Sequence, residues 1–157
     1  MQKILKIILV VVVCVTIGYL SGMVTRDSII TWYPTLVKPV FNPPNWIFAP
    51  VWTLLYVMMG IAAGLVWTSN SDEQTTKKAI GFFAIQFGLN VLWSYLFFGL
   101  HNPLLALIEI FLLLLMIYET YVQFKKIDKV AGMLLLPYLA WVSFATFLNA
   151  SIWWLNK

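Results

Sequence analysis

Aromatic and amide side chains recur at helical spacing in three apolar segments, and these residues are best suited to hold a ligand. The stripes are Trp52, Tyr56, Met59 and Ala63; Gln86, Asn90, Trp93 and Phe97; and Tyr138, Trp141, Ala145 and Leu148, with Asn149 beside the last. Residues at this spacing share one helix face. Amides are costly toward lipid and normally face the interior of a helical bundle. Two interpretations stay open: the stripes pack helices together, or they line a cavity for a flat apolar ligand.

Other residues that carry chemistry are scarce. Glu109 is a carboxylate inside an apolar segment, which makes it a candidate functional residue. No apolar segment supplies a Lys, Arg or His partner for it, so a proton relay is the weaker interpretation. The single cysteine, Cys14, excludes an internal disulfide and cysteine-based metal cages, and the single histidine, His101, excludes most metal and triad chemistry. We therefore expect neither a metal ion nor a cofactor.

The composition indicates a membrane protein. Of 157 residues, 62% are hydrophobic and only 10% are charged, and the mean hydropathy is +0.88. Soluble domains carry about 25% charged residues, so this chain cannot cover a water-facing surface. The net charge of +4 comes from few charges, whereas a nucleic-acid-binding protein needs a dense basic stripe. That class is excluded.

Five apolar segments meet or nearly meet the length that a helix needs to cross a bilayer: residues 7–24, 46–68, 79–100, 103–124 and 130–155. Only the fourth segment contains charged residues, Glu109 and Glu119. Strands of a membrane barrel would alternate in polarity, and the run Leu112–Met116 does not. The first segment resembles a signal peptide, but its apolar stretch is longer than that of a signal peptide and no A-x-A-like cleavage site follows. We therefore expect this segment to be retained as a transmembrane helix. The prediction is one all-α domain, residues 1–157, forming a bundle of five membrane-spanning helices.

Basic residues favour one side of this bundle. The N-terminus and the second and fourth connectors carry seven: Lys3, Lys6, Lys77, Lys78, Lys125, Lys126 and Lys129. The other side carries only Arg26, Lys38 and Lys157. The positive-inside tendency therefore predicts a cytoplasmic N-terminus, with the C-terminus and the first connector on the opposite side.

The first connector, Thr25–Asn45, is long for a packed bundle, and loops of this length are usually functional. It contains three aromatic residues and four prolines: Trp32, Tyr33, Phe41, Pro34, Pro39, Pro43 and Pro44. Prolines restrict their own backbone and that of the preceding residue, so the connector is not a flexible tether. Its aromatic residues suit either a belt at the membrane interface or a lid over a cavity.

Two pairs of small residues permit close approach between helices. They are Gly60-x-x-x-Gly64 and Ala84-x-x-x-Gly88. The pattern supports tight packing within the bundle, and it also allows a homodimer through one of these faces.

Combined motifs connect the chain to a known family. They read Trp32-Tyr33-x-x-Leu36-x-Lys38-Pro39-x-Phe41-x-Pro43-Pro44-x-Trp46, Pro50-Val51-Trp52-Thr53-Leu54-Leu55-Tyr56, Gln86-x-x-x-Asn90-x-x-Trp93 and Pro137-Tyr138-Leu139-Ala140-Trp141-x-x-Phe144-Ala145-Thr146-x-Leu148-Asn149. From Trp32 to the C-terminus, and in register, the sequence resembles the translocator protein family (TspO/MBR). This family includes tryptophan-rich sensory proteins and the animal peripheral-type benzodiazepine receptors.

The resemblance implies a five-helix bundle, often dimeric, whose first loop (residues 25–45) caps a ligand pocket. Family members bind porphyrins such as protoporphyrin IX, the isoquinoline carboxamide PK11195 and, in animals, cholesterol. By position, ten residues look like the pocket lining: Tyr33, Pro43, Phe48, Trp52, Gln86, Asn90, Trp93, Trp141, Ala145 and Leu148. Bacterial members are reported to degrade protoporphyrin in light, and the two tryptophans implicated look like Trp52 and Trp141.

Two departures from the family pattern bear on ligand and source. The animal cholesterol motif has a Tyr after the Leu-Asn of the fifth helix and then an Arg, whereas here Ala150 follows Asn149 and no Arg comes later. We therefore do not expect cholesterol recognition through this segment. The basic C-terminal tail of animal members is also missing, which favours a bacterial protein of the cell membrane.

Three functions stay open, in order of preference. The first is a membrane receptor or sensor that binds a free-base porphyrin or a similar flat apolar molecule. Its expected partners are membrane lipids and a second copy of the chain, and not nucleic acid. The second is a light-dependent porphyrin-degrading enzyme, in which Trp52 and Trp141 are redox-active neighbours of the ring. A porphyrin or sterol transporter is third, because five helices do not divide into two inverted halves.

Overall fold

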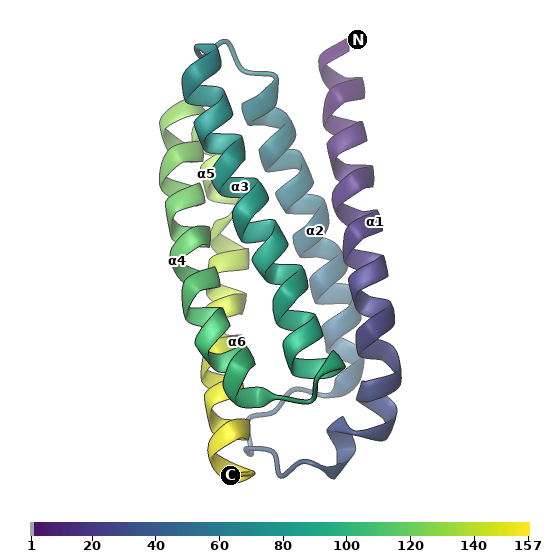
Figure 1. The fold of residues 1–157 in the computed structure, drawn as a ribbon. Helices are drawn as coiled ribbons and strands as arrows, with labels where there is room; N and C mark the ends of the chain where they lie inside the picture. The colour runs from purple at the N-terminus through teal and green to yellow at the C-terminus, as the bar shows by residue number, and fades with distance from the viewer. Residues whose placement is uncertain (1) are drawn as a thin grey trace.

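The computed structural model describes residues 2–157 as a bundle of helices (Figure 1). The elements are α1 (Gln2–Thr31), η1 (Tyr33–Thr35), α2 (Asn45–Trp67), α3 (Glu73–Ser94), η2 (Tyr95–Gly99), α4 (Pro103–Ile127), α5 (Lys129–Leu134) and α6 (Leu136–Leu155). Within the described residues, five helical segments are long and apolar enough to cross a membrane. Helix α3 continues into η2 as the third of them, and α5 with α6 forms the fifth. The predicted fold class is confirmed.

Helix α1 is longer at both ends than the predicted segment 7–24. Its polar C-terminal residues continue the helix because they find partners: the Thr31 hydroxyl donates to a carbonyl oxygen one turn earlier at 2.7 Å. The Ser28 hydroxyl donates to the carbonyl oxygen of Phe98 at 2.6 Å. Hydropathy marks the last apolar residue of a span, whereas the helix itself can continue beyond that residue. The α1–α2 connector is therefore shorter than predicted and comprises residues 32–44.

The fifth span is interrupted at Leu135, between the end of α5 and the start of α6. Pro137 accounts for the interruption, because it has no N–H for the helical ladder and its ring crowds the preceding turn. The backbone N–H of Leu135 donates to Gly132 O at 3.0 Å in a tightened turn, and Leu139 N–H then donates to Leu135 O at 2.9 Å. As a result α5 packs against both α2 and α4, while α6 packs along α4.

Helix α1 packs along α2 through two glycines. A Cβ at Gly60 would lie 2.6 Å from the Cα of Val11, and a Cβ at Gly64 would lie 2.9 Å from the Cα of Ile7. Only glycine permits this approach of two backbones. The Gly60–Gly64 face is therefore used within the chain, and a homodimer through this face, one of the two predicted options, is ruled out by the position of α1.

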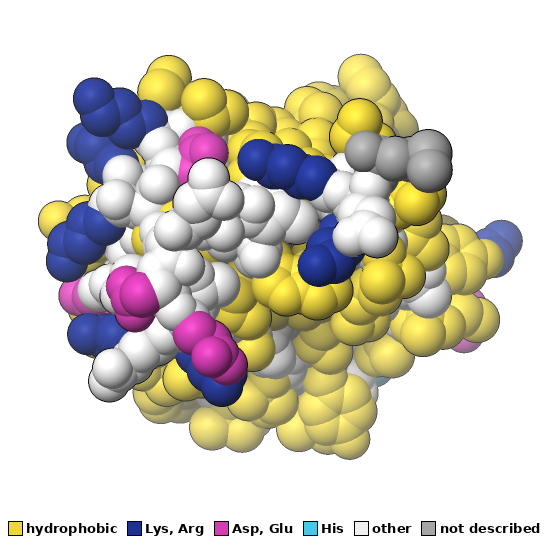
Figure 2. Space-filling view, turned by 90° about the horizontal axis from the view of Figure 1, so that it is seen from above, with side chains coloured by type: hydrophobic (Ala, Val, Ile, Leu, Met, Phe, Trp, Pro, Cys, Tyr) yellow, Lys and Arg dark blue, Asp and Glu magenta, His cyan; other side chains and the backbone are white. Residues whose placement is uncertain are grey.

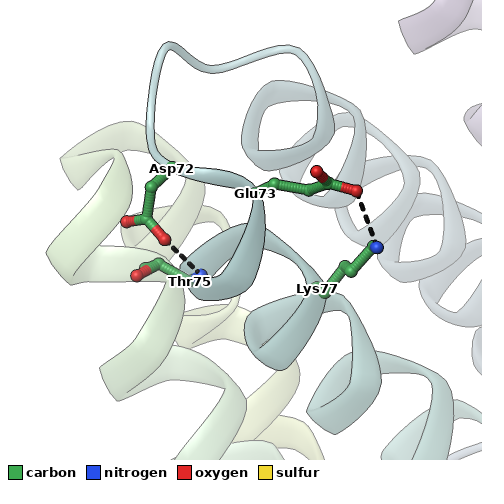
Figure 3. Close-up of polar contacts among 4 residues, drawn as sticks. All are labelled: Asp72, Glu73, Thr75 and Lys77. Atoms are coloured by element: carbon green, nitrogen blue, oxygen red, sulfur yellow. Dashed lines mark hydrogen bonds and ion pairs between the residues drawn. The ribbon is translucent and has the colours of Figure 1, made fainter.

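Charged side chains gather at the end of the bundle where α1 begins, which Figure 2 shows from above. At this end the Asp72 carboxylate accepts a hydrogen bond from the Thr75 N–H at 2.9 Å and so starts α3, and Glu73 forms an ion pair with Lys77 at 2.6 Å (Figure 3). The hydrogen bond from Thr75 holds the pKa of the Asp72 carboxyl below its usual range. The chain ends at the opposite end of the bundle (Figure 1).

Candidate functional site

The helices enclose a cavity beneath the α1–α2 connector. The centre of a water molecule can occupy about 50 Å³ of it, and the atom-free space of about 530 Å³ in and around it includes open space outside its mouth. The wall consists of Tyr33 from the connector, Phe48 and Trp52 from α2, Trp93, Phe97 and Phe98 from α3 and η2, and Trp141, Phe144, Ala145, Leu148, Asn149 and Ile152 from α6. None of these side chains carries a charge, and most are aromatic. The cavity therefore suits an apolar, flat molecule.

Trp93 is fixed in the wall by a chain of hydrogen bonds. Its Nε1–H donates to Asn149 Oδ1 at 3.1 Å, and Asn149 Nδ2 donates to the carbonyl oxygen of Pro103 at 2.8 Å. Asn149 is buried, so these bonds satisfy polar groups that water does not reach. Phe97 stacks on the indole with ring centroids 5.2 Å apart. The indole plane is thus held in one orientation.

Trp52 and Trp141 lie in the walls that α2 and α6 contribute. Trp52 meets Tyr138 of α6 edge to face, with ring centroids 6.3 Å apart. Trp141 meets Phe48 of α2 in the same way at 6.2 Å. Both indoles are half-buried. Aromatic rings therefore form the wall between these two helices.

The connector covers the cavity and is fixed by hydrogen bonds. Tyr33 is only 2% exposed, and its hydroxyl donates to Asn42 Oδ1 at 2.5 Å. Burial raises the pKa of the Tyr33 phenol to about 12. Lys38 Nζ donates to two connector carbonyl oxygens at 2.8 Å each, and the Asn156 side chain bonds both backbone groups of Val37 at 2.9 Å each. The connector is therefore fixed in place, and we call it the lid because its Tyr33 side chain forms part of the cavity wall.

The end of α1 is tied to the α3–α4 connection beside this lid. The His101 ring stacks on Trp32 with centroids 4.3 Å apart, and its Nε2 lies 3.0 Å from the Ser28 hydroxyl. Because Ser28 donates to the Phe98 carbonyl, it accepts from the Nε2–H of His101. His101 has a φ of 51°, which is uncommon for a residue other than glycine. These contacts hold Trp32 next to the lid residue Tyr33.

A group of polar side chains lies behind the cavity wall. The Tyr56 hydroxyl donates to Asn90 Oδ1 at 2.7 Å. Gln86 Oε1 and the Tyr138 hydroxyl are buried and have no hydrogen-bond partner among the described residues. Because the Tyr138 ring contacts Trp52, this polar group is separated from the cavity by one layer of aromatic side chains.

Glu109, the carboxylate predicted as a candidate functional residue, lies outside the cavity wall. It is buried, and neither of its carboxyl oxygens has a hydrogen-bond partner among the described residues. Among residues 2–157 no side chain is hydrogen-bonded to Glu109, so the structure shows no hydrogen-bonded chain for a proton relay at this carboxylate.

Seven of the ten residues predicted as pocket lining lie in the cavity wall: Tyr33, Phe48, Trp52, Trp93, Trp141, Ala145 and Leu148. Gln86 and Asn90 lie in the polar group behind the wall, and Pro43 lies in the connector, where its carbonyl oxygen accepts from Asn42 Nδ2 at 3.1 Å. The wall includes five residues that the predicted lining lacks: Phe97, Phe98, Phe144, Asn149 and Ile152. That the ten residues bind a ligand stays a prediction.

Helical spacing contained part of the signal for these additional residues. Phe97 belongs to one of the predicted stripes, and Ile152 continues another by one turn. Phe98 differs, because η2 is a π-helical turn in which Leu100 N–H donates to Tyr95 O, five residues earlier, at 2.8 Å. A widened turn changes which side chains face inward, and α-helical spacing does not register it.

The fold and the site define a multi-pass integral membrane protein with an aromatic cavity beneath a loop. Residues 10–155 match the model of the TspO/MBR family. The chain is 41% identical to Tryptophan-rich protein TspO of Chlorobaculum tepidum, over 99% of this chain and 98% of the relative. It is 43% identical to Tryptophan-rich protein TspO of Archaeoglobus fulgidus over 99% of each chain, and 36% identical to Translocator protein of Bos taurus over 89% of this chain and 83% of the relative. The chain therefore belongs to the TspO/MBR family, as its motifs indicated.

Membership of this family supports a receptor or sensor role in a membrane. The relatives come from a bacterium, an archaeon and a mammal. A bacterial source, the bacterial cell membrane and a cytoplasmic N-terminus therefore stay predictions.

Proposed function

We propose that the protein is a membrane receptor or sensor that binds porphyrins such as protoporphyrin IX, and related flat apolar molecules, in the cavity beneath the connector. The observation that carries the proposal is the wall, in which Trp52, Trp93 and Trp141 line one uncharged cavity. Stacked aromatic pairs contribute about 0.5–1.5 kcal/mol each beyond the burial of apolar area. A large planar ring therefore gains affinity from several indoles at once.

The size of the cavity supports a ligand that enters after side chains move. In this structure the cavity is smaller than the range of about 300–1,000 Å³ typical of small-molecule sites. Only about 50 Å³ admits the centre of a water molecule, so the aromatic rings must rotate before a porphyrin fits. The wall contains no histidine or cysteine, which are common axial ligands of haem iron. A free-base porphyrin suits this wall better than a ligated haem.

The test is a titration of the detergent-purified full chain with protoporphyrin IX in the dark, followed by tryptophan fluorescence. We expect saturable quenching, because the three indoles of the wall come into contact with the ring. Quenching that rises without saturation, as for a tryptophan peptide in the same detergent, would contradict the proposal.

A second candidate function is light-dependent degradation of the bound porphyrin. The position of both Trp52 and Trp141 in the cavity wall favours it, because the ring would absorb the light beside two oxidisable indoles. Illumination of the protein–porphyrin complex should then give a protein-dependent absorbance band. This band should disappear in Trp141→Phe, whereas binding in the dark should survive. If the spectrum of the complex does not change in light, the protein binds the porphyrin but does not degrade it.

We further propose that two copies of the chain form a homodimer through α3. Gly81, Ala84 and Gly88 are exposed on this helix, and no atom outside its backbone lies within 4 Å of a Cβ built at Gly81 or Gly88. Small exposed residues let two membrane helices approach closely. The other small-residue pair, on α2, is already covered by α1.

The orientation that we propose places the start of α1 in the cytoplasm and the connector on the opposite side of a bacterial cell membrane. Seven of the ten basic residues support it. Labelling of single cysteines in intact cells tests it: Ser71→Cys should be protected from an impermeant reagent and Thr35→Cys should react, each in a Cys14→Ser background. The reverse pattern would contradict this orientation.

A further inference from the structure

Helices α2 and α6 border the cavity on one side but are not packed against each other. The close backbone neighbours of α2 are α1, α3 and α5, and α6 has its extensive backbone contact with α4. Between α2 and α6 such contact is almost absent. Aromatic side chains span this space instead, with Phe48 of α2 meeting Trp141 of α6 at a centroid distance of 6.2 Å.

Partly exposed side chains make up much of the cavity wall on the same side. Seven wall residues are half-buried, and five of them belong to these two helices: Phe48, Trp52, Trp141, Phe144 and Ala145. The wall residues deeper on α6, Leu148 and Ile152, are buried. The part of the wall made by α2 and the first half of α6 is therefore not sealed by buried side chains.

The outer rim of this side consists of Phe144, which lines the cavity, and of neighbouring side chains that do not. Ala140, Phe144 and Phe147 recur at helical spacing on α6, and only Phe144 reaches the wall. Phe41 of the connector stacks on Phe147 with ring centroids 5.2 Å apart and meets Phe144 edge to face at 6.3 Å. Phe147 is 62% exposed, so the pair covers the rim from the outside.

We infer that the space between α2 and α6, bounded by Phe48, Trp141, Phe144 and the Phe41–Phe147 pair, is the passage by which a flat apolar molecule dissolved in the bilayer reaches the cavity. We call it the α2–α6 slot. The inference rests on the proposed function, because it gives the route of the ligand that the cavity is proposed to bind. The occupant of the slot is a molecule with a planar apolar ring system that moves edge-on from the hydrocarbon.

Two physical reasons favour the slot over a route beneath the connector. Opening the slot requires rotation of partly exposed side chains, which occurs in picoseconds to nanoseconds for exposed residues. Opening the connector requires loss of the hydrogen bonds of Tyr33, Lys38 and Asn156. In addition, an apolar ring concentrates in hydrocarbon rather than in water, so most of the ligand is already on the side where the slot opens.

The test is stopped-flow quenching of tryptophan fluorescence by protoporphyrin IX, in the dark, with the full chain in lipid nanodiscs. Phe147→Ala removes the outer ring of the rim. We expect the association and dissociation rate constants to rise together by about tenfold, with Kd changed by less than about twofold, because a passage affects both directions equally. Ala140→Phe adds a ring to the same stripe and should lower both rate constants, again with little change in Kd.

Two further variants decide between the routes. Phe111→Ala removes an equally exposed, lipid-facing ring from α4 (59% exposed) and should leave both rates unchanged. Asn156→Ala releases the connector from the end of α6. If Asn156→Ala accelerates binding while Phe147→Ala and Ala140→Phe do not change it, the ligand passes beneath the connector and the inference is wrong. A change of Kd without a change of the association rate in Phe147→Ala would also overturn it. Absence of saturable quenching in the unmodified chain would instead refute the proposed function itself.

Discussion

Individual side chains of the cavity wall are positioned by hydrogen bonds that are at least partly buried. Asn149 accepts from Trp93 while it donates to a backbone carbonyl, and Asn42 accepts from Tyr33. Removing one partner of such a buried pair costs more than the pair contributes, because the remaining group stays desolvated and unsatisfied. The wall is therefore sensitive to single atoms as well as to ring volume.

Trp93→Phe should destabilise the protein although it keeps an aromatic ring in the wall. The change leaves Asn149 Oδ1 buried without its donor, which lowers the free energy of unfolding by about 1–3 kcal/mol. Thermal unfolding in detergent measures this, with Trp46→Phe as the control, because Trp46 is 72% exposed. Equal stability of the two variants would show that the hydrogen bond to Asn149 contributes nothing.

Tyr33 should make the protein less stable at alkaline pH. Burial raises the pKa of its phenol from 10.0 to about 12, so the folded chain holds the proton more tightly than the unfolded chain does. This contribution is fully present below pH 10 and is lost as the pH rises through about 12. Tyr33→Phe has no phenolic proton at this position and should therefore lose less stability between pH 10 and about 12. Thermal unfolding curves of both proteins, recorded across this pH range, measure the difference. An identical alkaline loss in both proteins would contradict the assignment.

At the scale of elements, the sequence predicts the spans well and their ends poorly. The five spans follow from apolar length, which a bilayer imposes on any crossing helix. The end of α1 depends on contacts made far along the chain, such as Ser28 with the Phe98 carbonyl. The break at Leu135 depends on how the backbone adjusts around Pro137. Neither of these effects changes the hydropathy of the segment.

The candidate site divides in the same way. Helical spacing orients Trp52, Trp93 and Trp141 inward, and the structure brings all three to one cavity. Spacing does not give depth, however, because an inward amide can lie in the wall or behind it. Asn90 lies behind it, where it accepts from Tyr56. The depth of such a residue depends on the separation of the helices, which no single stripe encodes.

Gly60→Ala tests the packing of α1 on α2. In an isolated helix the change would stabilise by about 1 kcal/mol, but here the new Cβ meets the backbone of Val11 at 2.6 Å. We expect a net loss of about 1–3 kcal/mol, as for other overpacked cores. Gly22→Ala is the matched control, since no atom outside its helix backbone lies within 4 Å of that Cβ. Denaturant unfolding in mixed micelles measures both variants. A gain of stability in both would contradict the close packing of α1 against Gly60.

At the scale of the whole molecule, charged side chains gather at the end of the bundle where α1 begins (Figure 2), and the α1–α2 connector lies at the opposite end (Figure 1). The cavity is lined in part by Tyr33 of this connector. Between the two ends the outer surface is largely apolar, and α3 presents its small residues there. A second copy of the chain would cover this face of α3 without touching the α2–α6 slot, because the slot is formed by other helices. Dimerisation and ligand binding are therefore expected to be separable.

Gly88→Leu should dissociate the proposed homodimer. The leucine side chain would separate two α3 helices that meet through small residues, and it has free space within its own chain. Cross-linking in native membranes measures the dimer fraction, with Gly22→Leu on α1 as the control. Persistence of the dimer in Gly88→Leu at the level of the control would exclude this face of α3.

The measurement that tests the central claim most directly compares two leucine substitutions in the dark titration with protoporphyrin IX. Ala145 lines the cavity, and Ala49 on α2 is exposed outside it, so Ala145→Leu fills the ligand space and Ala49→Leu does not. If the porphyrin binds in the cavity, Ala145→Leu should raise the Kd measured from saturable quenching by at least about tenfold, which corresponds to a loss of about 1.4 kcal/mol of binding free energy. Ala49→Leu should bind like the unmodified chain. Both variants should keep the unfolding temperature of the unmodified chain. Unchanged binding by a folded Ala145→Leu protein would contradict the account, because the porphyrin would then bind somewhere other than this cavity.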